Sequence, residues 1–244
     1  MKEYLVCKPE YARKTRFLPA HLIYKIENGR LFREQIPVSL NGGVMVVGKI
    51  CGELDFLLTR KILAECLRFN FHGVMLALPP IPCDNTLSFS IELSSQLKKK
   101  GITLFLPMTY SACNDAVLLI PAMTNNASFY NYLNNICLKH PARKFSLELT
   151  SDAIEFKIPQ EENSQGIPIP GDKLKELLSD DVMTFYSHDL CTNYFTCKGS
   201  FYIFDTPGTL MSKKNVAKAL GISSCFYVIS PKNTAFLQKL EESI

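Results

Sequence analysis

The chain has 244 residues, of which 47% are hydrophobic and 20% are charged, and its 27 basic and 23 acidic side chains leave a formal net charge of +4. This length and composition exclude a disordered chain and favour one large folded domain over residues 1–244, because α/β barrels of this length commonly form a single domain. The one basic cluster, residues 98–100, ends a predicted helix, where lysines suit the negative end of the helix dipole, so we expect no nucleic-acid partner.

Cysteine usage and the N-terminal segment bear on the compartment and on metal binding. The 9 cysteines include no Cys-x-x-Cys pair, and the first residues lack the apolar run of a signal peptide, so a cytoplasmic protein with reduced thiols is expected. Zinc could be bound by His188, Cys191 and Cys197. The two cysteines have no second ligand pair beside them, however, and we expect no metal and no cofactor. No apolar segment reaches the roughly 20 residues that span a membrane.

Strand-like and helix-like segments alternate along the chain. Strands are predicted at residues 3–7, 21–26, 43–50, 73–78, 102–108, 116–122, 145–149 and 224–230. Most of these are apolar on both faces, which is typical of a parallel sheet covered by helices. Helices are predicted at residues 54–70, 85–101, 126–140, 207–221 and 231–243 from their amphipathic spacing and end signals.

Residues 150–206 interrupt this alternation with a polar, turn-rich segment followed by a predicted hairpin at 182–206. We interpret them as an excursion between the seventh and the eighth strand. Eight strand and helix units close most naturally into a (β/α)8 TIM-type barrel, whose active site would lie at the C-terminal ends of the strands.

Three segments carry a family resemblance. Residues 21–32 (HLIYKIENGRLF) look like a barrel strand with an Asn-Gly turn, and residues 71–79 (FHGVMLALP) look like the fourth strand. Residues 201–230 combine an aromatic strand, an acidic turn, a helix with a lysine in its middle, and the last strand. In this order the segments resemble the family 18 glycoside hydrolases, the chitinase-like barrels, and particularly the compact spore-cortex hydrolases of spore-forming bacteria.

The fourth strand of that family carries an Asp-x-x-Asp-x-Asp-x-Glu motif. The resemblance implies that the glutamate protonates the glycosidic oxygen and that the preceding aspartate orients the N-acetyl group of the substrate. At the four motif positions this chain has His72, Met75, Ala77 and Pro79. None of these residues can act as the acid at the barrel mouth.

Two further departures point the same way. The Met-x-Tyr-Asp motif of the family's sixth strand falls on or near Ile120, Ala122 and Met123. The family usually lines the sugar site with tryptophan, and this chain has 0 tryptophans. The resemblance therefore implies a catalytically inactive barrel that binds amino-sugar oligomers or peptidoglycan fragments, or serves as a scaffold for a protein partner, with a link to spores.

Two alternatives stay open. The chain could be a glycosidase whose acid has moved to Glu53, Asp55 or Asp115, or a protein-interaction module with an apolar patch over residues 150–206. Glu53 and Asp55 could equally favour the start of the helix that follows them.

Ligand-binding candidates lie near strand ends and on the hairpin. Near the fifth and sixth strands they are Tyr110, Asn114 and Asn125, and on the hairpin they are Tyr186 and His188. His188 and Asp189, as strand neighbours, are expected to point to opposite faces and to form no dyad. The hairpin aromatics could build a sugar-binding or protein-binding wall; they are Phe185, Tyr186, Tyr194, Phe195, Phe201 and Tyr202.

Two other features have a structural interpretation beside the functional one. Asp84, Asn85 and Thr86 are expected to cap the following helix. Cys113 could act as a nucleophile only beside a base, and otherwise it is a buried, inert thiol.

Overall fold

The computed structural model describes residues 1–12, 14–35, 40–123, 128–158, 166–178, 182–229 and 233–243. The chain divides into two compact units. Unit 1 comprises residues 1–120, 141–148 and 222–227, and unit 2 comprises residues 121–140, 149–221 and 228–244. The single domain expected over residues 1–244 stays a prediction.

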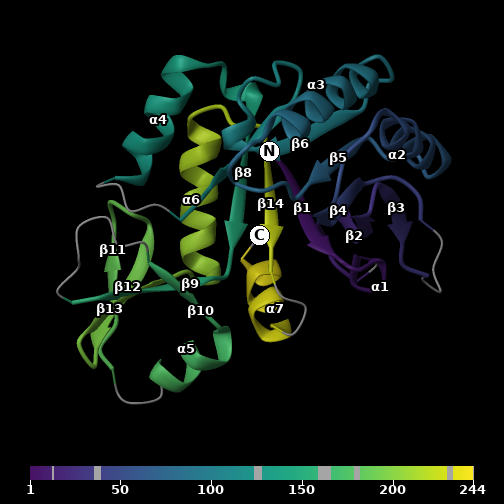
Figure 1. The fold of residues 1–244 in the computed structure, drawn as a ribbon. Helices are drawn as coiled ribbons and strands as arrows, with labels where there is room; N and C mark the ends of the chain where they lie inside the picture. The colour runs from purple at the N-terminus through teal and green to yellow at the C-terminus, as the bar shows by residue number, and fades with distance from the viewer. Residues whose placement is uncertain are drawn as a thin grey trace. The chain divides into compact units, whose positions relative to one another are not determined.

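Eight parallel strands close into a barrel, as the sequence predicts (Figure 1). Strand β1 pairs with both β14 and β2, and this double pairing joins the two ends of the sheet. All eight predicted strands are confirmed: β1 (Lys2–Cys7), β2 (Leu18–Glu27), β4 (Val44–Cys51), β5 (Gly73–Leu76), β6 (Thr103–Pro107), β7 (Val117–Pro121), β8 (Phe145–Thr150) and β14 (Ser224–Val228). Their apolar character on both faces fits, because one face lines the barrel interior and the other faces outward.

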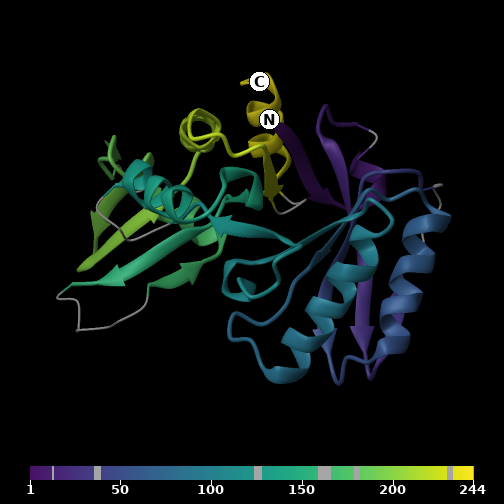
Figure 2. The same ribbon diagram turned by 90° about the horizontal axis from the view of Figure 1, so that it is seen from above.

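The connections within unit 1 differ in length. Helices α2 (Phe56–Arg68) and α3 (Asp84–Lys98) run side by side along the outside of the strands (Figure 2), and α1 (Pro9–Ala12) is a single turn. Strand β3 (Arg30–Arg33) returns antiparallel to β2 after a turn at Asn28 and Gly29, whose φ angles are 49° and 68°. Short 3-10 turns, η1 (Met108–Tyr110) and η2 (Ala142–Lys144), precede β7 and β8.

Unit 2 contains a five-stranded antiparallel sheet in the order β10-β9-β13-β12-β11. The predicted hairpin is confirmed as β12 (Thr192–Cys197) and β13 (Ser200–Phe204), joined by Lys198 and Gly199 at φ 48° and 75°. Two positive φ angles are typical of the turn that matches the twist of a hairpin. The remaining elements of this part are β9 (Ala153–Lys157), β10 (Ile167–Ile169), α5 (Gly171–Leu178) and β11 (Phe185–Ser187).

The other helices of unit 2 are α4 (Phe129–Lys139), α6 (Pro207–Ala219) and α7 (Thr234–Glu242). Together with α2 and α3, these confirm the five predicted helices with shorter bounds. Among the helices that the structure describes, none has both the length and the apolar character to cross a bilayer.

Candidate functional site

Three aromatic rings define which face of each strand points into the barrel. Tyr4 on β1 stacks on Phe226 on β14 with ring centroids 4.7 Å apart, and Phe105 on β6 lies 4.8 Å from Phe226 and 6.4 Å from Tyr4. Strand β6 is not a neighbour of β1 or of β14 in the closed sheet, so these rings can meet only across the interior. The middle of the barrel is therefore filled by aromatic packing.

The four positions that the resemblance assigns to the Asp-x-x-Asp-x-Asp-x-Glu motif lie on β5 and directly beside it. A Cβ atom on Gly73 would lie 2.8 Å from the Phe105 ring, so this position faces inward. Side chains alternate along a strand, so Met75 and then Ala77 face the same way, and the Ala77 N–H continues the pairing by donating to the Val47 carbonyl at 3.0 Å. The inward face of this strand thus approaches the C-terminal mouth without a carboxylate.

His72 lies at the other end of the barrel. Its Nε2 atom is 3.1 Å from the Tyr4 hydroxyl, just before β5 begins. His72 therefore lies far from the C-terminal mouth, and its side chain is exposed.

The loop after β4 holds two of the candidate acids. Asp55 is the N-cap of α2, and its Oδ1 accepts a hydrogen bond from the Leu58 N–H at 2.9 Å. Glu53 is exposed in the same loop. The Asn85 side chain stabilises this loop through two hydrogen bonds with the Leu54 backbone. It accepts from the Leu54 N–H at 3.2 Å and donates to the Leu54 carbonyl at 3.1 Å.

The cap of α3 differs from the predicted one. The N-cap is Cys83, and Asp84, Asn85 and Thr86 are already inside the helix. Thr86 completes the cap from the third helical position, because its Oγ1 accepts from the Cys83 N–H at 3.0 Å. The Thr86 hydroxyl lowers the pKa of the Cys83 thiol.

The connection from β6 to β7 separates its candidate residues. Tyr110 is fully buried and donates to Thr86 Oγ1 at 3.2 Å, so its hydroxyl has a structural partner. Asn114 and Asp115 directly precede β7 and therefore lie at the N-terminal ends of the strands, not at the C-terminal ends that the sequence suggests. Asp115 forms an ion pair with Lys98 at 2.6 Å.

Of the two alternatives for Cys113, a nucleophile or a buried thiol, the structure favours the buried thiol. It is 1% exposed, and burial raises the pKa of its thiol. A protonated, buried thiol is inert at neutral pH.

The hairpin candidates, Tyr186 and His188, lie in unit 2. Asn125, the candidate near the sixth strand, lies outside the described residues. Tyr186 and His188 are both exposed, and their rings meet edge-on at 4.8 Å. His188 and Asp189 belong to a turn between β11 and β12, so the argument from alternating strand faces does not apply to them. Among the described residues, no group of three histidine, cysteine or acidic side chains could hold a metal ion.

The predicted aromatic wall is divided between the two faces of the sheet. Phe195 and Tyr202 are buried and stacked at 4.7 Å in the core of unit 2. On the opposite face, Phe185 and Phe201 each lie 5.5 Å from Tyr194, in a partly exposed row. Only the second group could meet a ligand without unfolding the sheet.

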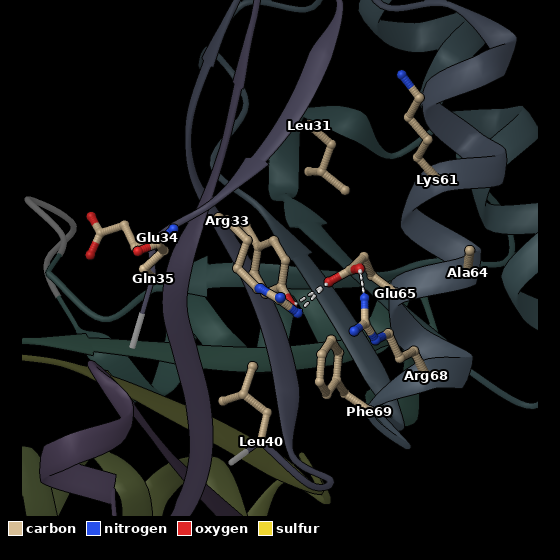
Figure 3. A pocket seen from close by; sticks show the side chains of 11 residues that line it. Leu31, Arg33, Glu34, Gln35, Leu40, Lys61, Ala64, Glu65, Arg68 and Phe69 are labelled. Carbon is tan, nitrogen blue, oxygen red and sulfur yellow. Dashed lines mark hydrogen bonds and ion pairs between the residues drawn. The ribbon is translucent and has the colours of Figure 1, made fainter. Parts of the chain in front are cut away.

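A cavity of about 850 Å³ lies on the flank of the barrel between β3 and α2 (Figure 3). Glu65 accepts from the Tyr24 hydroxyl at 2.9 Å and from Arg33 at 3.2 Å, and Arg68 approaches it at 3.9 Å. Both guanidinium groups also lie over the Phe69 ring, at 4.7 and 5.1 Å. Each guanidinium group therefore has an acidic partner and an aromatic ring beside it, and the acids Glu34 and Glu65 both line the cavity.

Comparisons with known proteins identify the architecture. No protein-family model and no curated protein sequence matches this chain. A chitinase from Chromobacterium violaceum has a similar structure, with a TM-score of 0.65 and 15% identity over 99% of this chain and 98% of that chain. This chain has the fold of the chitinases.

Two further chitinase-like structures extend the comparison. A GH18 chitinase from Cycas revoluta in complex with (GlcNAc)4 gives a TM-score of 0.62 at 10% identity, over 100% of this chain and 99% of that chain. The spore cortex-lytic enzyme SleL of Bacillus cereus gives 0.59 at 12% identity, over 98% of this chain and 74% of that chain. Likeness at such identities establishes the fold, which confirms the predicted chitinase-like barrel.

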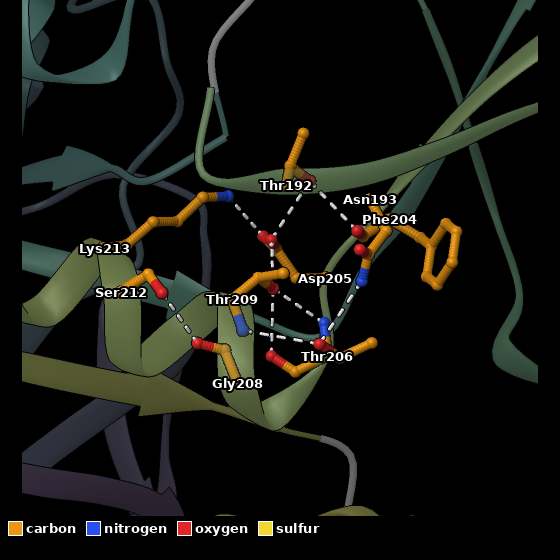
Figure 4. Close-up of polar contacts among 9 residues, drawn as sticks. All are labelled: Thr192, Asn193, Phe204, Asp205, Thr206, Gly208, Thr209, Ser212 and Lys213. Carbon is orange, nitrogen blue, oxygen red and sulfur yellow. Dashed lines mark hydrogen bonds and ion pairs between the residues drawn. The ribbon is translucent and has the colours of Figure 1, made fainter. Parts of the chain in front are cut away.

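The closing segment of this chitinase fold contains a buried ionic network that sequence reasoning did not resolve (Figure 4). Asp205 and Lys213 each have a side chain 1% exposed and form an ion pair at 2.5 Å. Thr192 and Thr209 donate to the same carboxylate at 3.1 and 2.8 Å, so both charges are held within a fixed polar environment. The spacing from the acidic turn to the lysine, two helical turns into α6, is the signal that could have indicated the pair.

Lys213 has a second partner. Its ammonium group lies 5.9 Å from the centroid of the Phe129 ring at the start of α4. The Phe129 N–H donates to the Asp189 carbonyl at 2.7 Å, which ties α4 to the turn before β12. The network therefore connects α4, α6 and β12 within unit 2.

Proposed function

We propose that this chain is a chitinase-like barrel without glycoside hydrolase activity, which binds amino-sugar oligomers at the C-terminal ends of its strands. The observation that carries the proposal is the interior face of β5, where Met75 and Ala77 precede Pro79. A thioether, a methyl group and a pyrrolidine ring have no proton to give to a leaving oxygen.

The relocated acids support the same conclusion. Glycoside hydrolysis ordinarily uses two carboxyl groups about 5 to 10 Å apart across the scissile bond. Asp55 is engaged as a helix cap, and Asp115 lies at the other end of the barrel in an ion pair with Lys98. Glu53 is then left without a carboxylate partner from the set of candidates.

Amino-sugar oligomers are the ligand class to which the fold points. The Cycas revoluta chitinase is in complex with (GlcNAc)4, and the Bacillus cereus protein is a spore cortex-lytic enzyme. A barrel that keeps this architecture can keep the cleft formed by its strand-to-helix loops after the acid is gone. Peptidoglycan fragments from spore cortex form the second ligand series to test, and an association with spores is part of the proposal.

The rival candidate is a glycosidase that uses Glu53. It is favoured by the position of this exposed carboxylate in the loop after β4, at the end of the barrel where family chemistry occurs. It predicts cleavage of the oligomers that disappears in Glu53→Gln, whereas our proposal predicts binding without cleavage.

The test is the shift in melting temperature with a series of N-acetylglucosamine oligomers and cortex fragments. A ligand at about 100 times its Kd stabilises a protein by about 2.7 kcal/mol, or roughly 5 to 10 °C for a chain of this size. Ala77→Tyr places a bulky side chain on the interior face near the mouth and should abolish the shift, whereas Lys100→Ala, at the end of α3, should preserve it. Absence of any shift in the unmodified protein would contradict sugar binding.

A further inference from the structure

The N-terminal opening of the barrel holds a second cavity, at the end opposite to the proposed sugar site. Its volume is about 360 Å³, and its lining comes from the starts of the barrel strands. Tyr4 and Phe105 form the apolar floor of this cavity, because both belong to the aromatic cluster that fills the interior. The polar lining residues are Lys2, His72, Thr103, Arg143, Ser223 and Ser224.

The charge of the lining has one sign. It contains an ammonium group, a guanidinium group and an imidazole, and none of the residues that line it is acidic. Among the described residues, neither Lys2 nor Arg143 forms an ion pair. The nearby acid, Asp115, lines the adjoining cavity together with Arg143 and is already paired with Lys98 at 2.6 Å.

The backbone keeps the cationic groups at this opening. The Lys2 N–H donates to the Ser223 carbonyl at 2.7 Å, which fixes the start of β1 beside the start of β14. Arg143 belongs to η2, directly before β8, and His72 is held by its contact with the Tyr4 hydroxyl at 3.1 Å. Partial desolvation of the exposed His72 ring, together with the charge of Lys2, lowers the pKa of His72.

Hydroxyl groups add hydrogen-bond donors to this field. Ser224 donates to Ser146 at 3.0 Å, so its proton is engaged, whereas the hydroxyls of Thr103 and Ser223 have no hydrogen-bond partner within the described part of the chain. A guanidinium group, an ammonium group and free hydroxyls are the donor set that binds phosphate oxygens in proteins. The flank cavity differs, because two acidic side chains, Glu34 and Glu65, line it beside its basic residues.

We propose that the N-terminal opening of the barrel binds a phosphate group, free or esterified to a small organic molecule, between Lys2 and Arg143. This end of such barrels ordinarily serves stability, with ligands at the opposite end. The site is independent of the proposed sugar site, since the two lie at opposite ends of the strands. The cavity exceeds the size of the ion alone, which leaves room for a small ester on the aromatic floor.

The test compares melting temperatures in chloride, inorganic phosphate and glycerol 3-phosphate at matched ionic strength. Saturating phosphate should raise the melting temperature by about 5 °C or more, and Arg143→Gln or Lys2→Gln should abolish the shift. Lys61→Gln, on the outer helix α2, is the matched control and should keep it. A larger shift with glycerol 3-phosphate identifies an ester as the ligand, and equal shifts identify the free ion.

A second measurement needs no variant. The imidazole NMR signals of His72 should move on titration with phosphate, while those of His188, on the hairpin of unit 2, should not. Equal phosphate shifts in the unmodified protein and in Arg143→Gln, or a His72 signal that stays in place, would overturn the proposal.

Discussion

At the scale of single residues, the strongest constraint is the pair of Asp205 and Lys213. Both side chains are 1% exposed, so each charge depends on the other for its stabilisation, and the two threonine hydroxyls add hydrogen bonds to the Asp205 carboxylate. Removal of one member of a buried pair leaves an uncompensated charge, which commonly costs about 3 to 5 kcal/mol.

We therefore expect Lys213→Met to lower the free energy of unfolding by about 3 kcal/mol or more, measured by urea denaturation followed by circular dichroism. Lys218→Met, an exposed lysine on the same helix, is the control and should change stability by less than about 0.5 kcal/mol. Similar losses in the two variants would show that the pair does not stabilise unit 2.

The thiols form a second prediction at this scale. Hydrogen bonding by Thr86 lowers the pKa of Cys83, whereas burial raises the pKa of Cys7 and of Cys66 to about 12. The thiolate is the reactive form, so Cys83 should be alkylated by iodoacetamide far faster than Cys7 or Cys66, and at a lower pH. Mass spectrometry of labelled peptides between about pH 6 and pH 9 measures the rates.

Thr86→Val is the matched variant, since it keeps the shape of the side chain and removes the hydroxyl. It should slow the alkylation of Cys83 and move its pH profile upward, without changing that of exposed Cys51. An unchanged pH profile of Cys83 alkylation would show that the Thr86 hydroxyl does not lower the pKa of this thiol.

At the scale of elements, α2 depends on its cap. Asp55 Oδ1 satisfies the Leu58 N–H, one of the unpaired donors of the first helical turn. Asp55→Ala should cost about 1 kcal/mol of stability, whereas Glu53→Ala in the same loop should cost less than about 0.5 kcal/mol. Equal effects in urea denaturation would mean that Asp55 has a role other than capping.

The elements also show what the sequence can and cannot predict. Barrel strands are recognisable because burial on both faces makes them continuous apolar runs, as in β5. Strand β3, with the sequence RLFR, is short and largely exposed, so its own residues give no such signal, and only the Asn-Gly turn before it indicates a hairpin. Strands β9 and β10 lie in a turn-rich segment without an alternating pattern of useful length, and they are defined by their pairing: β9 pairs with β13 of the hairpin, and β10 pairs with β9.

The candidate site was less predictable than the fold, for a geometric reason. Asp115 follows β6 in the sequence, which suggests a C-terminal strand end, but the connection has already crossed to the start of β7 by that residue. The cap of α3 was wrong by one position, since a cysteine takes the place usually held by serine, threonine or aspartate. The contacts of Glu65 with Tyr24 and Arg33 join segments that are distant in the sequence, so no local sequence pattern predicts them.

At the scale of the whole molecule, the chain has the barrel fold of chitinases, and β5 has apolar residues where the family resemblance leads us to expect acidic ones. The interior of the barrel is packed with aromatic rings, and the two ends of the strands differ in the chemistry they present. In the proposed function, the C-terminal end of the barrel binds amino-sugar oligomers and leaves them intact.

The most direct test is to incubate the protein with the N-acetylglucosamine tetramer at a concentration that shifts its melting temperature, and to quantify the oligomers by mass spectrometry. We expect the bound tetramer to be recovered at full length, at the level of a control without protein. Shorter oligomers that appear with time and vanish in Glu53→Gln would contradict it and identify a glycosidase with a relocated acid.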